Sequence, residues 1–349
     1  MQAFILNQGR VDPFVGWLAI DEFSEMLSRY MGAPIISVKK SPKSRWDKLM
    51  MRRGEIYFEG CSGDICGDIL IVIARSSPDL LLIRALGDFR KKFKKIVAWV
   101  ADSYFHEGYS DIVKEYDCIA VTAHEDVDFL RCKYGVKAVC IYQGIDCYRV
   151  VPKYSVSRSI DLIGFGRLPS SYLSAFKSRF HNSENPYLFL HSPIGSVVGQ
   201  DISIEREMLF KLLQRSKISL AFNLFCEPEG SRPRSMMVTS RWLESLAAGC
   251  LVVGKKPISR MADDVLHWKR PTIELSDDPI VATEEIQSIL RRFSEFDEMR
   301  QEGVNQMLLS HDWRYRILNF AEIFEFKLGD EIYDELRGLS GLAARCLES

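Results

Sequence analysis

Short runs of apolar, often β-branched residues alternate along the chain with longer stretches in which apolar residues recur every three or four positions. The short runs predict strands buried on both faces, and the longer stretches predict amphipathic helices. Strands that alternate with helices in this way are typical of parallel sheets with helices on both faces. The expected strands are 3–6, 33–38, 68–74, 95–102, 117–123, 137–142, 161–167, 186–192, 218–224 and 250–254. The expected helices are 17–31, 78–93, 109–116, 125–135, 171–180, 205–216, 239–249, 283–308 and 312–326.

The alternation is interrupted once, at 142–160, where the chain is irregular and polar. A length of 349 residues is too great for one ordinary core and suits about two domains. We therefore expect an α/β fold with two Rossmann-like domains, at 1–150 and 151–328. A helical tail at 329–349 is expected to pack back on the first domain.

Composition narrows the class of protein. Hydrophobic residues make up 47% and charged residues 27%, the balance of a soluble globular protein. A net charge of −1 provides no overall field that would select nucleic acid as a partner. The nine cysteines lack paired C-x-x-C spacing, which favours reduced thiols in the cytoplasm over a zinc site.

Two segments are strongly basic. The segment from Lys39 to Arg53 holds seven basic residues and one acidic residue, with Trp46 and several apolar residues between them. The segment from Arg90 to Lys95 adds five more basic residues. Such surfaces can dock on anionic lipid headgroups, with about 1 kcal/mol from each cation. Binding to an acidic polymer and a merely solvated face are the alternatives.

The stretch "SRPRSMMVTSRWLESLAAGCLVVG" (231–254) combines cations with the start of a predicted helix. Thr239 or Ser240 can cap that helix, which places Arg241 in its first turn and Glu244 one turn later. A helix N-terminus with Arg234 and Arg241 beside it could bind a diphosphate. The carboxylate of Glu244, one turn later, could accept hydrogen bonds from the hydroxyl groups of a ribose. The alternative is a surface ion pair between Arg241 and Glu244.

A second pattern is "DLIGFGR" (161–167), a predicted strand that ends in glycine-x-glycine. Gly164 and Gly166 would let backbone N–H groups approach a phosphate, and Arg167 would add a cation. Glycines of this kind also serve tight strand-to-helix turns without any ligand.

Groups able to transfer protons follow the predicted strands of the first domain. Asp102 ends one buried strand and His106 follows it within four residues, at the sheet edge where ligands of open α/β sheets bind. Glu125 follows the next strand, and Gly9 and Arg10 follow the first. Each of these residues could instead cap or turn the chain.

Several of these segments resemble glycosyltransferases of the GT-B fold. The likeness is to the group 1 type and to the related spore-maturation-protein glycosyltransferase-like family, and it covers about 95–325. The segments that carry it are "SRWLESLAAGCLVVG", "DLIGFGRL", "YDCIAVTAHEDVDFLRCKYGVKAVCIYQGIDCYRV" and "HDWRYRILNFAEIF".

The resemblance implies roles for the residues that match the family pattern. Glu244 matches the glutamate that binds the nucleotide ribose, and Arg167 matches a phosphate contact. Asp102 best matches the place of the family's catalytic group, with His106 second. Two departures stand out, because Met236 replaces the usual first glutamate and the lysine usual after "GRL" is absent.

The sequence therefore predicts a glycosyltransferase that moves a sugar from a nucleotide-activated donor to a glycan or lipid-linked acceptor, in polysaccharide biosynthesis. The active site would lie in the cleft between the domains, without a metal or other cofactor. Gly164, Gly166, Arg167, Arg234, Arg241 and Glu244 would bind the donor; Asp102 and His106 would be catalytic; Gly9, Arg10 and Glu125 would line the acceptor side. We expect a cytoplasmic protein that docks on the inner face of the membrane. The alternatives are a catalytically silent GT-B binding domain and a phosphorylase- or epimerase-like enzyme.

Overall fold

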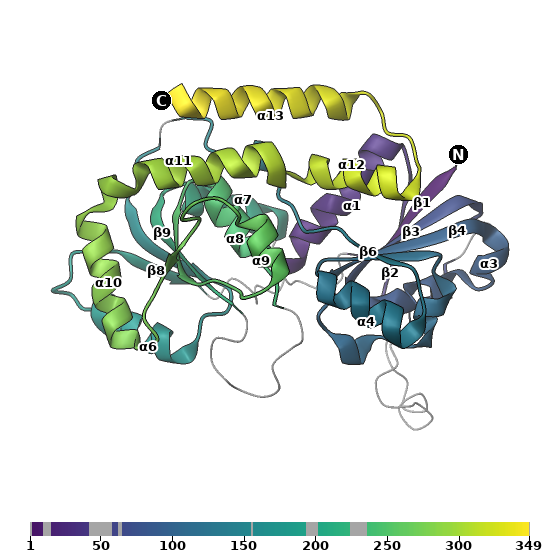
Figure 1. The fold of residues 1–349 in the computed structure, drawn as a ribbon, viewed down its shortest axis with the longest axis horizontal. Coiled ribbons are helices and arrows are strands. Elements are labelled where there is room, and N and C mark those ends of the chain that lie inside the picture. Colours follow the sequence, from purple (N-terminus) through teal and green to yellow (C-terminus); the bar gives the residue numbers. More distant parts are fainter. Residues whose placement is uncertain are drawn as a thin grey trace.

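A computed structural model describes residues 2–9, 15–41, 58–61, 65–154, 156–192, 202–223 and 236–348. Figure 1 shows two α/β halves side by side, with the C-terminal helices running across both of them. The α/β class with two parallel sheets that the sequence predicts is confirmed.

The first sheet has the strand order β2-β1-β3-β4-β5-β6, and all its neighbouring strands run parallel. Its strands are β1 (Ala3–Gln8), β2 (Ile35–Val38), β3 (Gly67–Ser76), β4 (Phe93–Asp102), β5 (Cys118–Val121) and β6 (Ala138–Cys140). The middles of the central strands, Ile69–Ala74 of β3 and Ile96–Ala101 of β4, are apolar at every position because helices cover both faces of the sheet.

The second sheet has the order β11-β10-β9-β7-β8 and is also parallel throughout. Its strands are β7 (Ile160–Phe165), β8 (Phe189–Ser192), β9 (Ser216–Phe222), β10 (Leu251–Lys255) and β11 (Ile273–Glu274). The short edge strand β11 was not predicted, because two residues are too few to show a pattern of apolar and polar positions.

The helices of the first half and the linker are mostly short. They are η1 (Val15–Trp17), α1 (Leu18–Met31), η2 (Ser77–Leu86), α3 (Phe89–Lys92), η3 (His106–Gly108), η4 (Asp111–Glu115), α4 (His124–Tyr134) and α5 (Cys147–Val150). The helix expected over 78–93 is a 3₁₀ segment followed by one short turn, because Gly87 takes a left-handed φ of 68° and interrupts it.

The second half carries α6 (Ser170–Phe180), α7 (Ile202–Gln214), α8 (Ser240–Ala247), α9 (Arg260–Val265), α10 (Pro279–Arg291), η5 (Phe293–Phe296) and α11 (Asp297–Gln306). The π-helical turn η6 (Met307–His311) and the helices α12 (Trp313–Phe324) and α13 (Glu331–Glu348) follow. The single helix expected over 283–308 is broken at Arg292, where the backbone leaves the helical region and Phe296 turns into the core.

The last two helices join the halves. Trp313 and Phe320 of α12 pack beside Phe23 and Trp99, so this helix belongs to the core of the first half although it lies within 151–328. In α13, Ile332 packs into the same core, whereas Leu339 and Ala343 pack into the core of the second half. The tail therefore contacts both halves.

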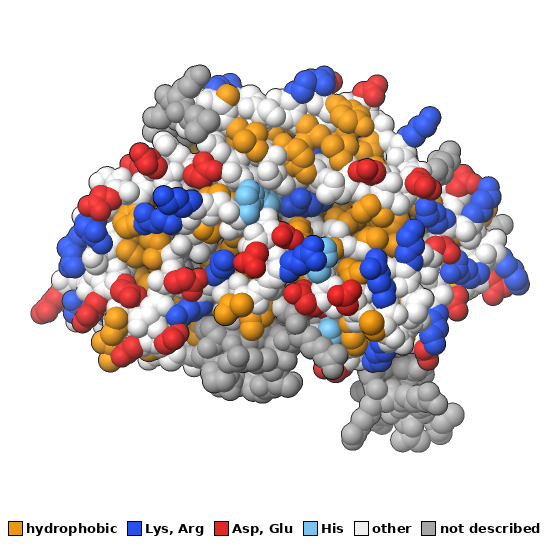
Figure 2. Space-filling view, in the orientation of Figure 1, with side chains coloured by type: hydrophobic (Ala, Val, Ile, Leu, Met, Phe, Trp, Pro, Cys, Tyr) orange, Lys and Arg blue, Asp and Glu red, His pale blue; other side chains and the backbone are white. Residues whose placement is uncertain are grey.

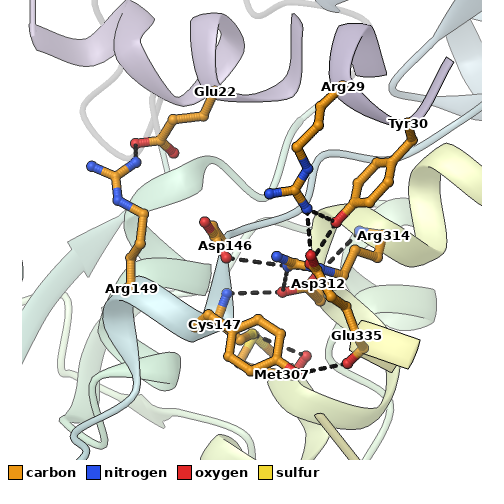
Figure 3. Close-up of polar contacts among 11 residues, drawn as sticks. Glu22, Arg29, Tyr30, Asp146, Cys147, Arg149, Met307, Asp312, Arg314 and Glu335 are labelled. Carbon is orange, nitrogen blue, oxygen red and sulfur yellow. Dashed lines mark hydrogen bonds and ion pairs between the residues drawn. The ribbon is translucent and has the colours of Figure 1, made fainter. Parts of the chain in front are cut away.

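Polar contacts reinforce this junction (Figure 3). Arg314 of α12 contacts Asp146 of the linker at 3.1 Å and Glu335 of α13 at 2.5 Å. Glu335 also accepts hydrogen bonds from Arg29 and Tyr30 of α1, each at 2.6 Å. Glu335 thus connects the tail to α1 and α12, and Arg314 extends the connection to the linker.

The surface fits the nearly neutral charge balance. Basic and acidic side chains are interspersed over the face in Figure 2. Within the described part of the chain, no helix is both long and apolar enough to cross a membrane.

Candidate functional site

The carboxyl ends of the two sheets meet between the halves. Arg167 follows β7 of the second sheet, and its guanidinium donates a hydrogen bond to the hydroxyl of Tyr104, just beyond β4 of the first sheet. A second contact joins Thr122, after β5, to Met237, with 3.6 Å between the hydroxyl oxygen and Sδ. This is the edge at which open α/β sheets bind ligands.

Asp102, the last residue of β4, lies at this meeting point. Burial raises the pKa of its carboxyl to about 7, and the charge of Arg167 opposes that rise. A carboxyl that titrates near neutral pH can take up or release a proton under ordinary conditions. The carboxyl of Asp102 can therefore exchange a proton near neutral pH at the junction of the sheets.

Arg241 lies next to Arg167. Its Nη1 donates to the backbone carbonyl of Arg167 at 2.7 Å, and its guanidinium lies over the ring of Phe165. Burial and the like charge of Arg167 lower the pKa of Arg241 to about 10. The nearby charge of Glu244 favours the charged form of Arg241 but does not offset these effects, and an anion beside the two guanidinium groups would stabilise them further.

Gly166 makes room for this arrangement. Its φ of 67° is in the left-handed region, and a Cβ atom at this position would collide with Nη2 of Arg241. Gly164 has a packing role instead, because a Cβ there would lie 2.7 Å from a methyl group of Leu168. Of the two glycines, Gly166 is therefore the one whose missing side chain leaves space for Arg241.

The start of α8 contributes to the same place. Thr239 is the N-cap with an extended backbone, and Arg241 lies in the first turn as predicted. The free N–H groups of this turn add partial positive charge beside the two arginines. Arg234 lies outside the described residues.

Glu244 of α8 is buried, with 1% of its surface exposed. Its Oε1 accepts a hydrogen bond from Nη1 of Arg206 at 2.5 Å. Arg206 in turn contacts Glu22 of α1 at 3.0 and 3.2 Å. The carboxylate that the resemblance assigns to the ribose is therefore part of an ion-pair chain that reaches the first half.

His106 is engaged within the first half. Its Nε2 lies 2.6 Å from Oδ1 of Asp126, and its ring stacks on Phe129 with the centroids 3.9 Å apart. Asp126 also accepts a hydrogen bond from Ser103, directly after Asp102. His106 is thus placed to support the loop that follows Asp102.

The residues expected on the acceptor side lie at the same edge of the first sheet. Gly9 directly follows β1, and its N–H donates to the carbonyl of Val38 at 3.0 Å. Glu125 lies in the first turn of α4, and its Oε2 is buried without a hydrogen-bond partner among the described residues. Arg10 lies outside the described residues.

Sequence reasoning missed Arg206 and Glu22. In α7, Arg206 lies on the apolar stripe, three and four positions before Leu209 and Phe210. In α1, Glu22 lies four positions before Met26 of the buried face. A charged residue on the apolar face of a helix needs a partner, and this pattern could have identified both residues.

No cluster of three or more His, Cys, Asp or Glu side chains that could hold a metal ion occurs among the described residues. The eight cysteines that the structure describes are free thiols.

Comparisons with known proteins bear on the family and the fold. The sequence model of a family described as "Glycosyl transferase-like" matches residues 194–322, which include α7, α8 and the strand between them. The search of curated proteins finds no match.

Solved structures match over nearly the whole chain. HepE from Anabaena, in complex with UDP and glucose, has a TM-score of 0.57 at 11% identity and covers 93% of this chain and 100% of its own. A glycosyltransferase from Rickettsia africae has a TM-score of 0.52 at 12% identity and covers 95% and 99%. The likeness confirms the GT-B fold, and the family match supports the resemblance to group 1 glycosyltransferases.

Proposed function

We propose that this protein is a glycosyltransferase that moves a sugar from a nucleotide-activated donor to a hydroxyl group of a glycan. The observation that carries the proposal is the contact between Arg167, after β7, and Arg241, at the start of α8, facing Asp102 across the junction of the two sheets. The fold and the family match support it.

The donor would bind on the second half. Its diphosphate would lie against the two arginines and the first turn of α8, and its ribose would lie beside Glu244. UDP is the nucleotide we test first, because the HepE structure holds UDP and a TarM structure from S. aureus, with a TM-score of 0.50 at 12% identity, also contains UDP.

The reaction follows from these positions. Asp102 takes the proton of the acceptor hydroxyl, whose oxygen then bonds to the sugar's anomeric carbon. The bond between that carbon and the diphosphate oxygen breaks, and the arginines stabilise the negative charge that develops on the departing nucleotide. These cations supply the stabilisation that a metal would otherwise give, so we propose that the reaction is metal-independent.

Asp102 could alternatively remain ionised and stabilise positive charge on the sugar. His106 would act on Asp102 through the Ser103–Asp126 contact. The acceptor would lie on the first half, near Gly9 and Glu125.

The acceptor is proposed to belong to polysaccharide biosynthesis at the inner face of a membrane. Support for the membrane comes from the basic composition of Lys39 to Arg53, of which positions 42–53 lie outside the described residues. In the second basic segment, acidic side chains neutralise much of the charge. The ion pairs are Arg90–Asp117, Lys91–Asp88, Lys94–Asp68 and Lys95–Glu325.

Nucleotide binding tests the function. We expect UDP to raise the melting temperature, because a ligand at a hundred times its Kd adds about 2.7 kcal/mol of stability. The gain should persist in EDTA and be largely lost in Arg241→Ala. The exposed Arg292 provides a matched control, and Arg292→Ala should keep the full shift.

The outcome separates three functions. Binding of UDP-sugar followed by transfer or slow hydrolysis supports the enzyme. The replacement of the first family glutamate by Met236 favours the catalytically silent binding domain. If neither UDP nor any other nucleoside diphosphate binds, that result would support the silent domain. Release of sugar 1-phosphate or an epimerised donor would point to the phosphorylase- or epimerase-like alternative.

A further inference from the structure

Arg206 connects the two halves at the carboxylate proposed for the donor. Its side chain is 3% exposed, and its Nη1 donates to Glu244 of α8 at 2.5 Å. The same group holds Glu22 of α1, with Nε at 3.0 Å from Oε1 and Nη2 at 3.2 Å from Oε2. One arginine therefore binds two buried carboxylates, one from each half of the molecule.

The geometry restricts both carboxylates. The contact with Glu22 is bidentate, the arrangement that fixes the plane of a guanidinium. Arg206 also lies over the ring of Phe210, 4.6 Å from its centroid, which fixes the same plane from the other side. Because Arg206 cannot turn freely, Glu244 is held in one orientation.

The chain continues into the linker. Arg149 of α5 donates to Oε1 of Glu22 at 2.6 Å, as the pair in Figure 3 shows, and contacts Glu207 at 2.5 Å. Arg206, Glu22 and Glu244 are buried, so little water screens the charges from one another. Glu22 and Glu244 are therefore linked through the one guanidinium between them.

We propose that Arg206 is a positioning residue for the donor ribose. By binding Oε1 of Glu244, it leaves Oε2 for the ribose hydroxyls once the arriving donor uncovers this buried carboxylate, while Glu22 fixes Arg206 from the first half. Recognition of the ribose thus depends on the contact between the two halves. The inference rests on the proposed function, since it assigns a positioning residue to the same nucleotide site.

A ribose-specific measurement tests it. UDP and 2′,3′-dideoxy-UDP are titrated calorimetrically into the wild type, Arg206→Lys, Glu22→Gln and Glu207→Gln. A hydrogen bond to a charged group should make UDP about tenfold tighter than the dideoxy compound in the wild type. Lysine keeps the positive charge but lacks the planar guanidinium that can bind two carboxylates at once. The preference for UDP over the dideoxy compound should therefore fall to about twofold in Arg206→Lys.

Glu207 provides the matched control. It is a glutamate that shares the Arg149 contact with Glu22, but its side chain is 49% exposed. Glu22→Gln should lose most of the preference for UDP, and Glu207→Gln should keep it. If folded Arg206→Lys and Glu22→Gln both retain the wild-type preference, Arg206 has no positioning role.

Amide hydrogen exchange without nucleotide gives a second measurement. Glu22→Gln should speed exchange in α8 (Ser240–Ala247), and Glu207→Gln should leave it unchanged. Equal exchange in both variants would refute the link between the halves. A wild type that binds no UDP overturns the proposed function and the ribose role together, whereas unchanged variants beside a binding wild type overturn the inference alone.

Discussion

The chemistry of Asp102 depends on where its strand ends. The residues before it in β4 are apolar, and the charge that acts on its carboxyl, Arg167, comes from the other half of the molecule. Burial raises the pKa of the Asp102 carboxyl to about 7. The positive charge of Arg167 lowers that pKa, but by less than burial raises it. The same aspartate in a solvated loop would titrate near 4 and would be a poor base at neutral pH.

Asp102→Asn should reduce turnover by at least about a hundredfold, because proton transfer by a positioned side chain typically contributes that much. In the wild type, turnover should rise with pH through about 7 as Asp102 loses its proton. Steady-state kinetics between pH 5 and 9 provide the measurement. Turnover that falls over this range would mean that Asp102 is not the base.

The same substitution should stabilise the protein at alkaline pH. The pKa of Asp102 is higher in the folded protein than in the unfolded chain, so folding favours the protonated carboxyl. The contribution of Asp102 to the free energy of unfolding is therefore greatest below about pH 4 and is lost as the pH rises through about 7. Asn carries no charge, so Asp102→Asn should be more stable by roughly 2–4 kcal/mol at pH 8 and by less at pH 5. Urea unfolding at both pH values measures the gain, and Asp128→Asn, at an exposed aspartate, should show none.

Among the elements, α13 has the most unusual position. Its N-terminal part packs on the first half through Ile332, and its later part packs on the second half through Leu339. Glu335, between them, contacts Arg29 and Arg314. The helix therefore stabilises the arrangement of the halves as well as each core.

Leu339→Ala should lower the free energy of unfolding by about 2–5 kcal/mol, because Leu339 is fully buried and its loss leaves a cavity. Leu188 is 52% exposed, so Leu188→Ala should change stability by no more than about 0.5 kcal/mol. Urea unfolding followed by circular dichroism makes the comparison. Equal small changes in both variants would show that the packing of α13 contributes little.

At the scale of the whole molecule, the charge pattern bears on membrane docking. The ion pairs from Arg90 to Lys95 leave that segment weakly charged, so docking would depend on Lys39 to Arg53. Vesicles with 30% anionic lipid should sediment the protein at low salt and release it at about 0.5 M salt, where screening is strong.

Charge reversal locates the membrane contact. Lys43→Glu with Arg45→Glu should abolish sedimentation, whereas Lys91→Glu with Lys94→Glu should leave most of it. If the wild type stays in solution at low salt, both basic segments are solvated faces.

The alternation of apolar runs and amphipathic stretches was sufficient to predict two parallel α/β halves, because burial on both faces of a strand leaves a distinct pattern. The same local signals placed Arg241 in the first turn of α8 and Asp102 at the end of β4. They failed at Gly87 and Arg292, where one backbone angle interrupts an otherwise helical pattern.

Long-range pairing was decided by the tertiary structure alone. The sequence places Glu22, Arg206 and Glu244 in three separate helices, and no local period records that they share one ion-pair chain. Likewise, the raised pKa of Asp102 and the contact between Arg167 and Tyr104 exist only because two strand ends from different halves meet. Local geometry follows from neighbouring residues, whereas burial and the choice of charge partner depend on how the halves pack.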